Sequence, residues 1–173
     1  MNIFHIFTHK KQQKETLFRN FVFGVEDSLV STVGLLAGVA SGGIVGKSIV
    51  TTGIVLIFVE AFSMGIGSFL TEEATEELDG GVSNQWEAAK GALTMFGSYL
   101  LAGFIPLAPY IFAPNDQAVI YSVASSLIGL AVLGYSSAKI FRYGYPMHRA
   151  IKVALLGGVA VMIGMLVGRI FQV

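Results

Sequence analysis

Five long apolar segments constrain this chain more than any other feature. They cover approximately residues 17–40, 48–70, 88–112, 118–141 and 150–171. Each is long enough for the ~20 residues that a helix needs to cross a bilayer core, where every backbone polar group must be hydrogen-bonded internally. None alternates polar and apolar residues as a barrel strand would. We therefore predict an all-α integral membrane protein, a bundle of five transmembrane helices forming a single domain over residues 1–173.

The composition excludes several functions. No cysteine is present, so disulfides, thiolate metal sites and cysteine nucleophiles are excluded. The formal net charge is zero, and we expect no nucleic-acid partner. The three histidines lie outside the apolar segments, and no pair of a nucleophile and a base is visible. We expect neither an enzyme nor a prosthetic group.

The basic residues predict the orientation in the membrane. Nine of the eleven fall on one side of the five spans: Lys10, Lys11, Lys14, Arg19, Lys90, Lys139, Arg142, Arg149 and Lys152. Lys47 and Arg169 fall on the other. An excess of Lys and Arg marks cytoplasmic loops, so the N-terminus should be cytoplasmic and the C-terminus outside. We expect residues 3–7 to form a short amphipathic interfacial segment. The compact chain and the lack of targeting features favour a prokaryotic plasma membrane.

Small residues recur at every fourth position in two segments. Gly34, Gly38, Gly42 and Gly46 do so around the end of the first span, and Ala160, Gly164 and Gly168 in the fifth. This spacing allows two helix backbones to approach closely. Packing within one subunit and contact between subunits both fit the pattern.

Two carboxylates lie where the bilayer makes them costly. Asp27, with Glu26 beside it, is inside the first span, and Glu60 is near the middle of the second. A carboxylate at mid-membrane costs about 2.5 kcal/mol or more, and no Lys or Arg is expected at that depth. A buried ion pair or a protonated, hydrogen-bonded acid is the structural alternative. We favour an ion or proton path.

Met64 follows Glu60 by one helical turn, so the two side chains share a face. A carboxylate oxygen combined with a thioether sulfur suits a first-row transition ion better than Mg2+ or Ca2+. Methionine in an apolar helix is more often a packing residue, so this motif by itself is weak.

An acidic run, TEEATEELDG, follows the second span. Glu72 and Glu76 are four residues apart, as are Glu73 and Glu77. If the helix continues beyond the membrane, the like charges repel, and a divalent cation would relieve the repulsion. A solvated helix end is the alternative.

Three blocks of the sequence resemble the vacuolar iron transporter family, also described as nodulin-21-like. They are GVEDSLVSTVGLLAGVASG at 24–42, EAFSMGIGSFLTEE at 60–73 and GFIPLAPY at 103–110. The resemblance implies a homodimer of five-helix subunits with a metal path along the dimer interface. It implies export of Fe2+, with Mn2+ or Co2+ tolerated, in exchange for protons. Asp27 and Met64 match residues of the family's translocation path, and the acidic run begins where the family's cytosolic metal-binding glutamates begin.

The chain also departs from this family. The link between the second and third spans covers only about residues 71–87, so most of the family's cytosolic metal-binding domain is absent. Ser28 replaces the family glycine after the first-span aspartate. Leu56 stands where some relatives carry a glutamate, and Glu60 is a candidate replacement.

Together, these features predict transport of divalent transition-metal ions out of the cytoplasm. The predicted metal-binding residues are Asp27, Glu60, Met64, Glu72, Glu73, Glu76 and Glu77. Two other functions remain open. A carrier of a small organic cation would use the same acids and would not need Met64. A non-transporting membrane subunit would move no ion when purified alone.

Overall fold

The computed structural model describes residues 3–78, 84–141 and 144–171, with side chains in the first helix described from Gln13 onward. Within these ranges the chain forms five helices and no strand: α1 (Ile3–Ser41), α2 (Lys47–Leu78), α3 (Gln85–Phe112), α4 (Asn115–Ile140) and α5 (Pro146–Ile170). All five are long and apolar enough to cross a membrane. The predicted five-helix membrane fold is therefore confirmed.

Two helices are longer than the sequence predicts. α1 begins at Ile3 and runs without a break for 39 residues, so residues 3–7, expected to form a short amphipathic interfacial segment, are the first part of this helix. The reason is that residues 3–23 contain neither glycine nor proline, and the Lys, Gln and Glu residues within them favour helix. α2 likewise continues past residue 70 to Leu78, which places the acidic run on a helix.

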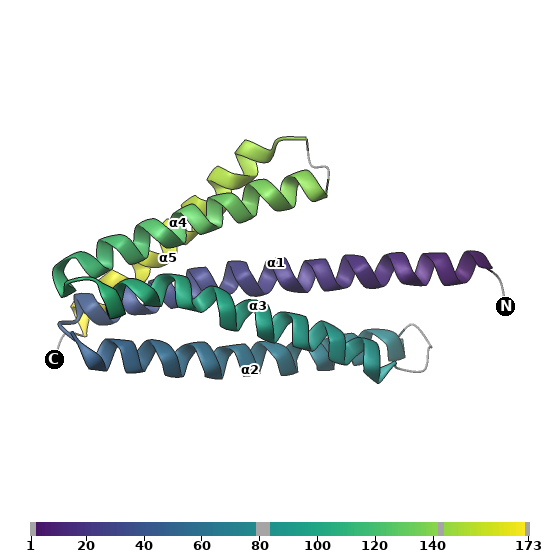
Figure 1. Cartoon of the computed structure of the whole chain (residues 1–173), viewed down its shortest axis with the longest axis horizontal. Coiled ribbons are helices and arrows are strands. Elements are labelled where there is room, and N and C mark those ends of the chain that lie inside the picture. Colours follow the sequence, from purple (N-terminus) through teal and green to yellow (C-terminus); the bar gives the residue numbers. More distant parts are fainter. Residues whose placement is uncertain (1–2, 79–83, 142–143, 172–173) are drawn as a thin grey trace.

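The helices alternate in direction. The N-terminus, the α2–α3 link and the α4–α5 link lie toward one end of the molecule, whereas the α1–α2 and α3–α4 links and the C-terminus lie toward the other (Figure 1). The two groups of basic residues inferred from the sequence are thus at opposite ends, as predicted. Arg142 is outside the described residues.

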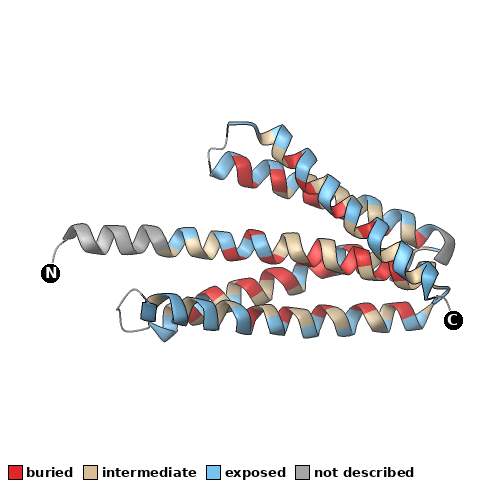
Figure 2. Ribbon diagram, turned by 180° about the vertical axis from the view of Figure 1, so that it is seen from behind, coloured by how far each residue is buried: buried red, intermediate tan, exposed pale blue. Residues whose placement is uncertain are grey.

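The core surrounds α1: one buried cluster joins it to α2 and α3, and two others join it to α4 and α5. Buried segments gather in the second half of α1 and along α3, while much of the surface of α2, α4 and α5 is exposed (Figure 2). At Gly103 of α3, an added Cβ would lie 2.7 Å from Cγ1 of Ile57 and 3.0 Å from Oγ of Ser28. Glycine is needed here because a side chain would push three helices apart.

The recurring small residues pack α1 against α5 within one chain. An added Cβ at Gly38 would lie 2.7 Å from the carbonyl oxygen of Gly164, and one at Gly34 would lie 3.3 Å from that of Ala160. Gly42 approaches Gly168 in the same way. The intramolecular interpretation is therefore confirmed for these positions. Gly46 lies in the α1–α2 turn with a φ of 66° and does not belong to this contact.

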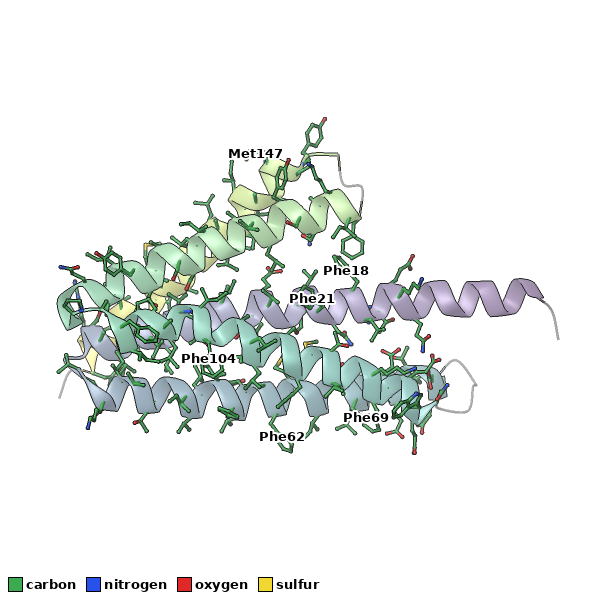
Figure 3. The ribbon with its side chains drawn as sticks, in the orientation of Figure 1. Phe18, Phe21, Phe62, Phe69, Phe104 and Met147 are labelled. Atoms are coloured by element: carbon green, nitrogen blue, oxygen red, sulfur yellow. The ribbon has the colours of Figure 1, made fainter. Side chains whose placement is uncertain are left out.

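Apolar side chains cover the outer faces of the helices. Phe62 on α2 is 64% exposed and projects away from the bundle (Figure 3). Exposed Ile128 of α4 and Leu155 of α5 belong to the same kind of surface. In a five-span protein these faces contact lipid, because acyl chains solvate them without cost.

Candidate functional site

Asp27 of α1 and Glu60 of α2 both lie in the membrane-spanning part of the bundle, near enough for the charge of Glu60 to act on the Asp27 carboxyl. The two helices are antiparallel and both side chains are half-buried. Glu60 is the one charged group among the described residues that acts on the Asp27 carboxyl. No cation within the described chain neutralises either acid. The ion-pair alternative is not supported.

A hydroxyl pair borders the two acids. The Tyr99 hydroxyl of α3 and Ser31 Oγ of α1 are 2.6 Å apart, and either can donate the hydrogen bond. Tyr99 is fully buried, and its phenol interacts electrostatically with both Asp27 and Glu60. Sequence reasoning missed Tyr99 and Ser31. Ser31, one turn after Asp27, was a usable signal, but nothing in the sequence places Tyr99 beside it.

Met64 lies one turn beyond Glu60 and is half-buried, on the row of α2 that also carries the acid. The oxygen and sulfur donors inferred from the sequence therefore face the same region. Three donors from one chain do not complete the coordination of a transition ion. Among the described residues, moreover, no three His, Cys, Asp or Glu side chains gather closely enough to hold a metal.

The acidic run forms the last turns of α2, beyond the spanning part. Glu72, Glu73 and Glu76 are half-buried and Glu77 is exposed. The Glu76 carboxylate accepts a 2.5 Å hydrogen bond from the backbone N–H of Asn84, which holds the residue before α3 against the end of α2. Helical geometry turns Glu73 and Glu77 away from Glu72 and Glu76 by about 100°. This separation is one reason why the run does not gather as a cluster.

The two substituted family positions have different surroundings. The buried hydroxyl of Ser28 donates a 2.7 Å hydrogen bond to the carbonyl oxygen of Tyr99, so it ties α1 to α3 immediately beside Asp27. Leu56 is half-buried one turn before Glu60, on the same row of α2. A carboxylate at residue 60 therefore remains on the helix face that a carboxylate at residue 56 would use.

A second polar contact between α1 and α2 lies nearer the acidic run. Asn20 is 7% exposed, and its Nδ2 donates a 3.0 Å hydrogen bond to Ser68 Oγ. Gly91 of α3 leaves the space for the amide, since an added Cβ there would lie 2.9 Å from Nδ2. Sequence reasoning missed both residues, although a polar side chain within a predicted span was a usable signal.

Comparison with known proteins assigns the family. A sequence model described as VIT family matches residues 18–79 and 73–169. The vacuolar iron transporter 1 of Tulipa gesneriana is 25% identical over 203 aligned positions, covering 82% of each chain. That of Arabidopsis thaliana is 22% identical, covering 95% of this chain and 90% of the relative.

These alignments also locate the main difference between this chain and its relatives. The 203 aligned positions exceed the 173 residues of this chain, so the tulip relative has additional residues inside the aligned region. The two matched family segments meet at residues 73–79, within the acidic run. This agrees with a member that lacks most of the cytosolic domain between the second and third spans. The match covers most of the chain, and the chain therefore belongs to the VIT family.

Proposed function

We propose that this protein moves divalent transition-metal ions, Fe2+ first and Mn2+ or Co2+ as further substrates, out of the cytoplasm in exchange for protons. The observation that carries the proposal is the Asp27–Glu60 pair, which lies at membrane depth beside Met64 without a neutralising cation among the described residues. Relatives named as vacuolar iron transporters support the same substrate class.

Exchange follows from competition for the same oxygen atoms. Two close carboxyl groups in a bilayer cannot both carry an uncompensated charge without a large cost. Either protons or a divalent cation can supply the compensation, and metal binding releases the protons. The carboxyl pair therefore alternates between a protonated and a metal-bound form, and no separate proton site is needed.

The proposed assembly is a two-fold homodimer in which the second copy completes the metal coordination. Phe23, one turn before Asp27, is 51% exposed, so this face of α1 is open to a partner. Phe23→Cys should form a disulfide-linked dimer on mild oxidation, a clear result since the native chain has no cysteine. Ile128→Cys, on exposed α4, should not. Non-reducing electrophoresis distinguishes them, and crosslinking of Ile128→Cys alone would place the interface elsewhere.

The proposed orientation puts the N-terminus and the α2–α3 link in the cytoplasm, since Lys and Arg prevail at that end. The acidic run then faces the metal source. For the host membrane we propose a prokaryotic plasma membrane, across which the ion leaves the cell. A reporter enzyme that works only outside the cytoplasm should therefore be active when it is fused to the C-terminus.

The acidic run should raise metal capture without forming the central site. Replacing Glu72, Glu73 and Glu77 by Gln should raise the KM for metal severalfold and leave the maximal rate almost unchanged, because the local cation concentration falls. Adding Glu76→Gln tests whether Glu76, which accepts the hydrogen bond from Asn84, also contributes to metal capture. Initial uptake rates over a range of Fe2+ concentrations give both parameters. A collapse of the maximal rate would instead make the run part of the central path.

Reconstitution tests the proposed function directly. Purified protein in proteoliposomes that contain a metal indicator and a pH-sensitive dye should admit Fe2+ and release protons in parallel. Metal uptake without a pH change would remove the proton coupling. Uptake of an organic cation in place of metal would support a carrier, and no uptake of either would support a non-transporting subunit.

A further inference from the structure

Polar side chains connect the acidic run to the central acids along two facing helix rows. On α2 the row is Glu60, Met64, Ser68, Glu72 and Glu76, each four residues from the next and all half-buried. On α1 the row is Gln13, Asn20 and Asp27, each seven residues from the next. Residues at these spacings share a helix face.

The two rows are in register. Asn20 donates a hydrogen bond to Ser68, and Asp27 is near enough to Glu60 for the two charges to interact. The contact at Asn20 is thus about 10–12 Å from the acids, since the helices rise 1.5 Å per residue. On α2, Ser68 lies between Met64 and Glu72. An ion that follows this row from the acidic run to the acids must therefore pass the Asn20–Ser68 contact.

At this point of the two rows, α1 and α2 are in direct contact. The Asn20 amide is buried between Ser68 and Gly91, and the hydrogen bond joins α1 directly to α2. One heptad earlier on the same row, the buried Nε2 of Gln13 has no hydrogen-bond partner among the described residues. The row on α1 therefore includes one polar group, on Gln13, that no internal hydrogen bond satisfies among the described residues.

We propose that Asn20 and Ser68 form the constriction of the metal route, closed by their mutual hydrogen bond. This rests on the proposed transport function. When the bond opens, Asn20 Oδ1 and Ser68 Oγ become two neutral oxygen ligands for the passing ion. Neutral oxygens suit a position between two acidic regions, because conduction requires binding that is weak enough to release the ion. A third carboxylate would retain it.

Thiol accessibility tests the constriction without depending on transport. In a Met64→Cys background, a cationic, membrane-impermeant methanethiosulfonate reagent should react slowly when applied from the α2–α3 link side. Ser68→Ala should accelerate that reaction about fivefold, the factor expected from losing one hydrogen bond of typical net strength. Asn20→Ala should do the same. The double variant should react no faster than either single variant, since all three lack the same bond.

Two matched variants separate loss of this hydrogen bond from a general effect of substitution in α2. Ser68→Thr keeps a hydroxyl and should react as slowly as the parent. Ser63→Ala makes the same change at an exposed position of α2 and should have no effect. Equal rates for Ser68→Ala and Ser63→Ala would overturn the proposal and leave the bond as a simple packing contact. If Ser68→Ala accelerates thiol modification equally from both sides of the membrane, the proposal is also overturned, because the substitution has then loosened the whole bundle. Failure of the parent to transport metal would instead refute the proposed function.

Discussion

Asp27→Asn is expected to reduce metal uptake at least about 100-fold. Loss of a residue that only supports a metal ligand already costs 10–100-fold in affinity or activity, and Asp27 is proposed as a direct ligand. The amide has almost the same volume as the carboxyl but can neither carry charge nor exchange a proton. The variant should fold normally, because it removes a charge that is costly to hold in the bilayer. Initial rates of Fe2+ uptake in proteoliposomes, with a melting curve in detergent, measure both effects.

Glu26→Gln is the matched control for this variant, since it makes the same change at the adjacent half-buried acid of α1. It should retain uptake within about threefold, as expected for a residue that contributes no more than a typical hydrogen bond or exposed charge. Met64→Leu keeps apolar bulk and loses the sulfur, so it should weaken Fe2+ or Co2+ uptake more than Mn2+ uptake. Parental transport by Asp27→Asn would contradict the metal path and leave the family resemblance as evidence of fold alone.

Gly38→Val is expected to cause a large loss of stability. The added Cβ would lie 2.7 Å from the carbonyl oxygen of Gly164 and 3.0 Å from its carbonyl carbon. Both atoms are backbone, so α1 and α5 would have to separate. Overpacking of this kind costs about 3 kcal/mol, which should lower the Tm in detergent by roughly 6–12 °C.

Gly67→Val controls for the change of residue type. Gly67 is an exposed helical glycine of α2, and an added Cβ there meets nothing within 4 Å. Its Tm should stay within a few degrees of the parent. Similar losses at both positions would mean that helix propensity, and not the contact between α1 and α5, sets the effect. No loss at Gly38 would contradict the close approach of the two helices.

Much of the fold could be predicted because membrane insertion leaves few alternatives. An apolar segment of about 20 residues must be helical when no water can satisfy its backbone, so the five spans followed from hydropathy alone. The ends of the helices did not. Hydropathy falls after residue 70, yet α2 continues to Leu78, because helix propensity and not lipid governs the chain beyond the membrane.

The candidate site divides in the same way. Asp27, Glu60 and Met64 could be selected from the sequence, since the cost of a buried charge and the helical period are local properties. Three contacts could not be predicted: Tyr99 with Ser31, Asn20 with Ser68, and the packing of the small residues of α1 against α5. These depend on which helices are neighbours and in what register. That choice is made by side-chain packing between segments far apart in the chain, and only the tertiary structure contains it.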